Sequence, residues 1–242
     1  MSGGGFGPDR TAQEGWSRFL DAVGHELRTP LTAILGYQEL LEEGVYGQLE
    51  PKGAEAVRRV GAAAHELLSL LNGMIDLGRP DGQPPELDIA PVPLTGLLRE
   101  VAASGQRLGP ERGVDWSDDV PDDLPIVTSD PNRLQRALFL AVLAAIRATP
   151  GGAIRMSVAP EDDGATIRLH GVGFQDLPEP PLADLVLRRA EDDTERSVLR
   201  MAVALHGLRR LGGSWTLETG GTATLALRIR PAPHDPPRAP SR

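Results

Sequence analysis

Apolar residues in the first third of the chain recur at steps of three and four, the spacing that places side chains on one face of a helix. Between Thr11 and about Glu43 this face comprises Phe19, Val23, Leu27, Leu31, Ile34, Leu35 and Leu41. A second run, from Pro51 to about Leu77, carries Val57, Val60, Ala64, Leu67, Leu68, Leu71 and Ile75 on one side. The segment GVYGQ separates the two runs, and Pro51 suits the first turn of a helix. The pattern predicts a long helical hairpin.

Two helices cannot enclose two long apolar stripes by themselves. A hairpin of this kind usually dimerises into a four-helix bundle, so we expect the chain to form a homodimer. The stretch GRPDGQPP, from Gly78 to Pro85, then breaks the helical pattern and is typical of a linker.

Beyond this stretch, short strand-like segments alternate with longer helix-like ones. Strands are expected at Leu87–Val92, Val114–Trp116, Pro125–Thr128, Ala153–Ala159, Thr166–His170, Ser214–Glu218 and Thr222–Arg230. Helices are expected at Leu94–Gln106, Asp130–Thr149 and about Ser197–Leu211. Asp130 and Pro131 fit an N-cap followed by proline at the first helical position. The order predicts an α+β domain with helices on one face of a mixed sheet.

These signals divide the chain into five segments. Residues 1–10 and 231–242 are rich in glycine or proline and are expected to be disordered. Between them we expect the helical hairpin over 11–79, a linker over 80–85 and the α+β domain over 86–230.

The amino-acid composition and net charge exclude several classes of function. The 242 residues are 40% hydrophobic and 24% charged, which is ordinary globular usage. The absence of cysteine excludes a disulfide scaffold, a thiol nucleophile and a cysteine-ligated metal. The net charge of -9 argues against a general nucleic-acid binder. We find no apolar run long enough to span a bilayer and no signal peptide, and therefore expect a cytoplasmic protein without a membrane segment.

One histidine stands out within the first predicted helix. His25 lies two residues from Val23 and from Leu27, about 200° around a helix, so it is expected to face away from the apolar stripe. Glu26 follows directly, and Thr29 lies one turn further on the same side. Neutral imidazole with a carboxylate beside it is a plausible nucleophile, although a surface histidine without function would look the same in isolation.

The remaining histidines give no such signal. His65, His170, His206 and His234 lack the spacing of metal ligands, and we expect each to be an ordinary surface or edge residue. The helical zinc motif H-E-x-x-H fails because its last position is Thr29. No metal site is predicted.

The string HELRTPLTAI, from His25 to Ile34, resembles the H-box of the sensor histidine kinases of two-component systems. The text that follows, LGYQELLEEGVYGQLEP, is also similar to the dimerisation and phosphotransfer hairpin of that family, and the resemblance covers residues 12–79. In that family the histidine is the phosphoacceptor and the next acidic residue assists as general base. The residue four positions on helps to dephosphorylate the partner regulator. The resemblance implies these roles for His25, Glu26 and Thr29.

The second half resembles the ATP-binding domain of these kinases in the order of its elements, which implies an α/β sandwich. Residues 129–149 are similar to the helix bearing two magnesium-site asparagines, but Leu140 and Ala144 stand at those positions. Neither residue offers the oxygen ligands that a hard cation requires.

Two further nucleotide boxes also depart from the family. The segment IRLHGVGF is similar to Asp-x-Gly-x-Gly, with Gly171 and Gly173 as matching candidate nucleotide contacts and Leu169 at the aspartate position. Val198 and Arg200 fall where glycines would let the backbone approach phosphate, and we expect Arg200 to lie on the surface at a helix start. Losses in three boxes predict that this domain does not hold Mg-ATP in the usual way.

The combined prediction is a two-component phosphotransfer protein that carries a phosphoryl group on His25 and passes it to an aspartate of a response-regulator receiver domain. Its autokinase activity is doubtful, and an upstream kinase is a candidate partner besides the regulator and a second copy of the chain. Two alternatives stay open. One is a standard autokinase with divergent nucleotide boxes, which would use Mg-ATP; the other is a non-catalytic dimeric adaptor of a kinase or regulator. No cofactor is predicted with certainty.

Overall fold

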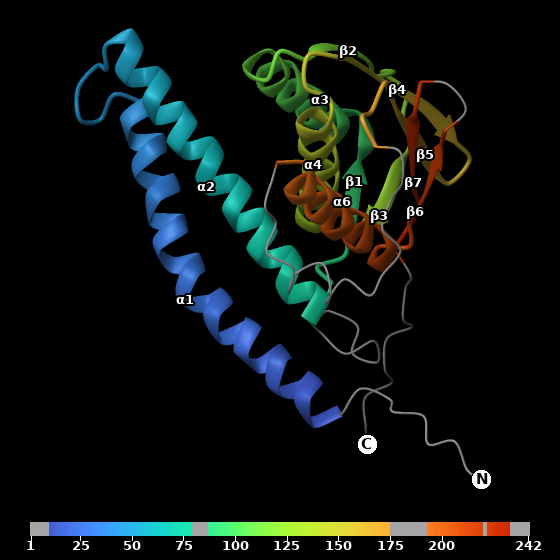
Figure 1. The fold of residues 1–242 in the computed structure, drawn as a ribbon, viewed down its shortest axis with the longest axis horizontal. Coiled ribbons are helices and arrows are strands. Elements are labelled where there is room, and N and C mark those ends of the chain that lie inside the picture. Colours follow the sequence, from blue (N-terminus) through green and yellow to red (C-terminus); the bar gives the residue numbers. More distant parts are fainter. Residues whose placement is uncertain (1–9, 79–86, 175–192, 220–221, 233–242) are drawn as a thin grey trace. The chain divides into compact units, whose positions relative to one another are not determined.

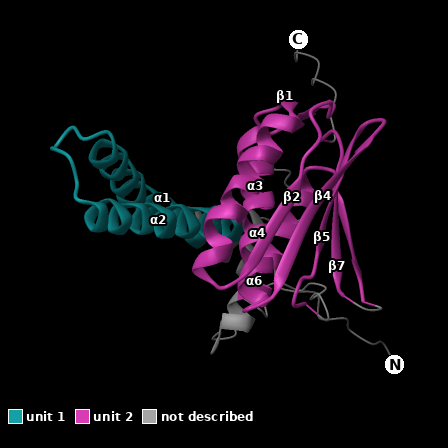
Figure 2. Cartoon of the chain, turned by 90° about the horizontal axis from the view of Figure 1, so that it is seen from above, with its two compact units in different colours: residues 1–85 teal, residues 86–242 magenta. Residues whose placement is uncertain are grey.

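The computed structural model describes residues 10–78, 87–174, 193–219 and 222–232. They belong to two compact units, residues 1–85 and residues 86–242 (Figure 2). The predicted linker and most of both predicted disordered ends lie outside the described residues. None of the described helices combines the length and the apolarity needed to span a bilayer.

The first unit is a hairpin of two long helices, α1 (Arg10–Glu42) and α2 (Pro51–Gly78), drawn in blue and cyan in Figure 1. Both predicted helices are therefore confirmed to within one residue at each end. Their shared core contains Leu31 and Leu35 of α1 and Ala64, Leu71 and Ile75 of α2, with Leu20 and Leu68 partly buried against it.

Each predicted apolar stripe divides into a buried and an exposed part. On α1, Phe19 is 56% exposed, Leu27 45% and Ile34 41%. On α2, Val60 is 54% exposed and Leu67 52%. Leu27 and Ile34 are seven residues apart, as are Val60 and Leu67, so each helix keeps an apolar row that its partner in the hairpin leaves exposed.

The second unit contains a five-stranded sheet with the order β2-β4-β5-β7-β6. Its strands are β2 (Asp115–Asp119), β4 (Ala153–Glu161), β5 (Gly164–His170), β7 (Thr224–Ile229) and β6 (Ser214–Glu218). Only β2 and β4 run parallel; the other neighbours in this sheet are antiparallel. A separate antiparallel pair joins β1 (Ala90–Pro93) to β3 (Ile126–Ser129).

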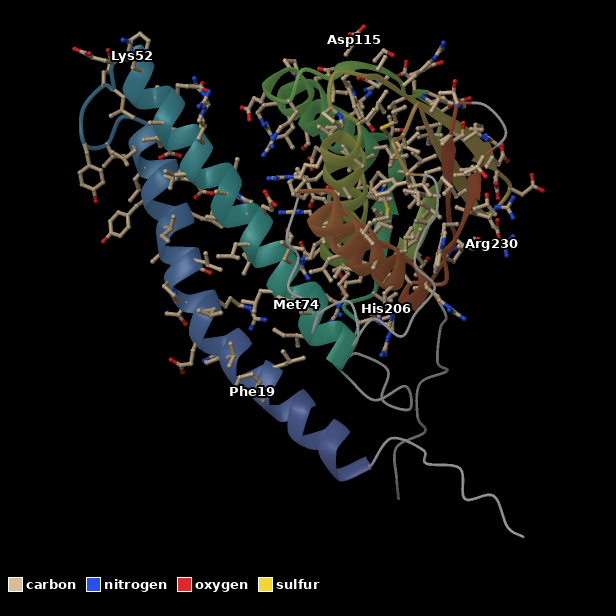
Figure 3. All side chains as sticks on the ribbon, viewed as in Figure 1. Phe19, Lys52, Met74, Asp115, His206 and Arg230 are labelled. Atoms are coloured by element: carbon tan, nitrogen blue, oxygen red, sulfur yellow. The ribbon has the colours of Figure 1, made fainter. Side chains whose placement is uncertain are left out.

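Three helices, α3 (Leu94–Glu111), α4 (Pro131–Ala148) and α6 (Asp193–Arg210), cover one face of the five-stranded sheet (Figure 2). Side chains fill the space between helices and sheet in Figure 3. Along β4, Ile154, Met156 and Val158 are buried while Ala153 and Arg155 between and beside them are exposed, which is the alternation of a sheet with one covered face. The predicted α+β fold is confirmed.

The N-terminus of α4 forms as predicted. The Asp130 carboxylate accepts a hydrogen bond from the backbone N–H of Arg133 at 3.0 Å, and Pro131 occupies the first helical position. The remaining boundaries shift by a few residues. β1 starts at Ala90 rather than Leu87, and β2 extends to Asp119 because it pairs with β4 along its whole length.

Two boundaries were predicted wrongly at the other end of the chain. α6 begins at Asp193 rather than Ser197, since the acidic sequence DTE suits the positive end of a helix. The ordered chain also continues beyond residue 230. The N–H of Ala232 donates to the carbonyl oxygen of Thr128 at 2.8 Å, and the Ala232 side chain is buried.

Candidate functional site

The three residues singled out on α1 all lie at the surface of the hairpin. His25, Glu26 and Thr29 are each exposed, so the predicted outward position of His25 is confirmed. The Thr29 hydroxyl donates to the carbonyl oxygen of His25 at 3.4 Å, one helical turn away. A nucleophilic imidazole, a carboxylate and a hydroxyl therefore project from the same turn and a half of helix.

The packing beneath His25 is tight because its neighbour in sequence is a glycine. A Cβ on Gly24 would lie 2.1 Å from Cδ1 of Ile75, so α1 and α2 approach each other closely at this level. A side chain larger than hydrogen at position 24 would force Ile75 to move. The backbone that carries His25 is thus seated directly against α2.

A polar contact between the helices lies in the same region and was missed by the sequence analysis. Arg28 donates from its guanidinium to Oδ1 of Asn72 at 2.7 Å, and Asn72 is only 9% exposed. A buried amide must find a partner, so this bond favours one register of α1 against α2 near the H-box. The signal in the sequence was Asn72, a polar residue within an otherwise apolar stretch of α2.

The positions that match the magnesium asparagines lie inside the second unit. Leu140 is 1% exposed and Ala144 0% on α4, and Leu169 of β5, which matches the aspartate of the second nucleotide box, is also 0% exposed. Helix α6 packs along α4, as shown by Gly207, where a Cβ would lie 3.4 Å from that of Ala137. Leu140, Ala144 and Leu169 are therefore core residues and present no polar group to a ligand.

The two retained glycines have a packing role of their own. Gly171 has a φ of 89°, and a Cβ there would lie 2.1 Å from the carbonyl oxygen of Ala153. A Cβ on Gly173 would lie 1.8 Å from the carbonyl oxygen of Ala148. The Gly173 N–H also donates to the Thr149 hydroxyl at 2.8 Å. Glycine is needed at both positions by the fold itself.

Arg200 was expected on the surface at the start of a helix, and this expectation is wrong. Because α6 begins at Asp193, Arg200 lies in its second turn and is only 8% exposed. Val198 is half-buried on the same helix. Within the described residues, the segment matching the third box is therefore regular helix, without a turn that would cradle phosphate.

Comparison with known proteins finds a family model that matches the hairpin. Residues 16–83 match the His Kinase A (phospho-acceptor) domain. The circadian input-output histidine kinase CikA of Synechococcus elongatus is 28% identical over 180 residues, which cover 73% of this chain and 24% of CikA. The sensor protein DivL of Caulobacter vibrioides is 34% identical over 143 residues, which cover 57% of this chain and 18% of DivL.

An uncharacterized sensor-like histidine kinase of Rhizobium meliloti is 29% identical over 68% of this chain and 32% of its own length. The chain thus spans a third or less of these curated relatives. Among solved structures, full-length ShkA in complex with AMPPNP superimposes with a TM-score of 0.53 at 24% identity, covering 89% of this chain and 47% of ShkA. This similarity supports the fold.

Proposed function

We propose that this chain, which belongs to the two-component sensor histidine kinases, carries a phosphoryl group on His25 and exchanges it with an aspartate of a response-regulator receiver domain. The observation that carries the proposal is the string HELRTPLTAI in a helix where His25, Glu26 and Thr29 are exposed together. A partner protein can reach all three side chains without any rearrangement of the hairpin.

The chemistry requires one free ring nitrogen on His25. That nitrogen attacks the phosphorus of an acyl phosphate, a P–N bond forms, and the P–O bond to the aspartate breaks, releasing the carboxylate. Glu26 accepts the proton that leaves the other ring nitrogen. The steps run in reverse when His25 phosphorylates the regulator. We assign Thr29 to the dephosphorylation of the regulator, where its hydroxyl would orient the attacking water.

We further propose that a phosphorylated partner, rather than ATP, loads His25. A Mg-nucleotide site needs oxygen ligands for the cation and an acceptor for the adenine amino group. The matching positions are Leu140, Ala144 and Leu169, all 1% exposed or less. Each lost charge-assisted contact costs roughly 1.5–3 kcal/mol, so the combined losses remove several powers of ten in affinity even if they are not additive.

The proposed functional unit is a homodimer. Leu27, Ile34, Val60 and Leu67 are between 41% and 54% exposed in the single hairpin. Burying such rows against a second copy would complete a four-helix bundle, with residues 11–79 as the dimerisation and phosphotransfer segment. The hydrophobic gain, about 25 cal/mol for each Å² of apolar surface covered, favours this assembly.

The proposal is tested by offering His25 two phosphoryl donors in parallel. The purified chain is incubated with radiolabelled Mg-ATP in one reaction and with a phosphorylated receiver domain in the other, with His25→Ala as control in both. We expect label on His25 only from the receiver domain, and no Mg-ATP binding in calorimetry at millimolar nucleotide.

The other outcomes separate the alternatives. Stoichiometric labelling by ATP alone would identify a working autokinase with an unfamiliar nucleotide pocket. Absence of label from both donors, in a protein that still binds the receiver domain or a kinase, would identify a non-catalytic adaptor.

A further inference from the structure

The face of the five-stranded sheet that the helices leave open carries a compact group of polar side chains. Arg155 and Ser157 of β4 lie directly opposite His170 and Arg168 of β5, respectively. Directly opposed residues of antiparallel strands share a face, so these four side chains form a square on the open side. The residues between them, Met156 and Leu169, point into the core and are fully buried.

A chain of hydrogen bonds runs along one diagonal of this square. Oγ of Ser157 lies 3.0 Å from Nε2 of His170, and Nδ1 of His170 lies 3.2 Å from Oγ1 of Thr224 on β7. In one tautomer of His170, Thr224 donates to Nδ1 and the Nε2–H donates to Oγ of Ser157. The hydroxyl proton of Ser157 then points away from the His170 ring. That proton is then available to an acceptor above the sheet.

The two guanidinium groups occupy the other diagonal. Arg155 and Arg168 are both exposed, and within the described part of the chain neither makes a hydrogen bond or an ion pair. A third arginine of the same face, Arg228, is already bonded to Glu161 at 3.0 Å. Among the described residues, these two arginines thus form no ion pair, although the chain as a whole has a net charge of -9.

The nearest carboxylates on this face lie outside the square. Asp115 and Asp119 of β2 flank Ser117, which is opposite Arg155, so they are one strand away from that arginine. Glu218 of β6 is opposite Thr224 of β7 and is two strands away from Arg168. The four residues of the square themselves carry a charge of plus two from Arg155 and Arg168, with the Ser157 hydroxyl and the His170 imidazole between the charges. A doubly charged phosphate group matches that charge, and guanidinium forks match its oxygens geometrically.

We propose that Arg155, Ser157, Arg168 and His170 form a binding site for a dianionic phosphate group on the open face of the sheet. Arg155 and Arg168 would contact its oxygens from two sides, and Ser157 would donate to it with His170 and Thr224 fixing the hydroxyl. The site is separate from His25 and does not depend on phosphotransfer there.

The test is a titration of the full chain with inorganic phosphate at pH 8, followed through the imidazole signal of His170 in NMR spectra. His170→Gln identifies that signal. We expect saturable binding that Arg155→Gln and Arg168→Gln each weaken by about tenfold or more, the usual loss for a charge-assisted contact. Arg228→Gln, the matched control on the same face, should leave the affinity unchanged, and Asp119→Asn should strengthen it.

The source of the phosphate is distinguished in a second arm. A phosphoserine peptide, its unphosphorylated counterpart and inorganic phosphate are compared with the wild-type chain. Tighter binding of the phosphoserine peptide assigns the site to a phosphorylated protein, and tighter binding of inorganic phosphate assigns it to a small phosphate compound. The proposal is overturned if no saturable shift occurs at millimolar phosphate, or if Arg155→Gln, Arg168→Gln and Arg228→Gln have equal effects while all remain folded by circular dichroism.

Discussion

The H-box residues of the first unit are polar and lie at the surface, whereas the matching nucleotide-box positions of the second unit are apolar and lie in the core. His25, Glu26 and Thr29 are all exposed on α1. Leu140 and Ala144 of α4, by contrast, have at most 1% of their surface accessible. Both units keep the fold that their sequence resemblance implies, yet only one of them keeps polar groups where that resemblance places the chemistry.

The difference has a physical basis. An exposed histidine on a helix contributes almost nothing to the stability of the hairpin, so packing does not require it. A buried leucine or alanine on α4 instead contributes apolar surface to the core, and it stabilises the domain whether or not a nucleotide binds. A fold can therefore be maintained by packing after its site has changed.

The largest effect should follow from removing the imidazole. His25→Ala should abolish phosphoryl transfer to and from a receiver domain, because no other side chain of α1 at this level offers a nucleophilic nitrogen. The change removes little buried area, so the unfolding free energy should shift by less than about 0.5 kcal/mol. Transfer assays and chemical denaturation measure the two quantities. Retained phosphate on the variant would mean that the carrier is another residue.

A second prediction concerns the exposed apolar row of the hairpin. Leu67→Glu should convert a dimer into a folded monomer at micromolar concentration, since a carboxylate in a bundle core would be buried without a partner. Val45→Glu, in the loop between α1 and α2, where Val45 is 60% exposed, is the matched control and should leave the dimer intact. Sedimentation equilibrium measures the assembly. A monomeric wild-type chain would show that the row has another purpose.

A substitution at position 144 tests most directly whether the nucleotide-box positions of the second unit are core positions. Ala144→Asn brings back an amide at a magnesium-site position, but the side chain would be larger and its polar atoms buried. We expect a loss of about 3 kcal/mol in local stability, from overpacking and an unpaired amide together. Ala103→Asn, at an exposed position of α3, should cost only about 0.5 kcal/mol from helix propensity.

Hydrogen exchange over the α4 peptides measures the effect, alongside calorimetry with Mg-ATP. If Ala144→Asn were harmless and also bound Mg-ATP, position 144 would border an open nucleotide pocket, and the contrast between the two units would disappear.

The sequence predicted regular elements well where a local rule applied. Heptad-like spacing located α1 and α2, and the Asp130–Pro131 pair located the start of α4. The prediction was less accurate where tertiary contacts determine the ends of an element. β2 is extended by its pairing with β4, and α6 starts earlier than its apolar pattern indicates, because its first turn is polar. The spacing of apolar residues reveals the buried face of an element, but it gives no information about a helix end made of polar residues.

The candidate functional residues likewise divide into those that a local motif reveals and those that only tertiary contacts bring together. His25 could be found from a contiguous motif, since all residues that matter lie within one stretch of helix. The group around His170 could not, because Arg155 and Thr224 become its neighbours only through strand register. His170 was expected to be an ordinary surface or edge residue; it is half-buried on β5, which lies inside the sheet. Contacts between distant strands leave no local signature in a single sequence.

The smallest expected effect tests how tightly the helix that carries His25 packs against α2. Gly24→Ala adds a methyl group that would meet Ile75, whereas the same change at Gly96 of α3 meets nothing within 4 Å. Alanine favours a helix over glycine by roughly 0.5–1 kcal/mol, so Gly96→Ala should stabilise its unit by about that amount.

For Gly24→Ala the clash outweighs this gain, and we expect a net loss of about 1 kcal/mol because overpacking typically costs 1–3 kcal/mol. Hydrogen exchange over the α1 and α2 peptides of the full chain separates the two variants by sign. If Gly24→Ala protected α1 as much as Gly96→Ala protects α3, Ile75 would have room to move and the helix carrying His25 would be free to shift against α2. Slower phosphoryl transfer in the destabilised variant would instead show that close packing at Gly24 holds His25 in position for its partner.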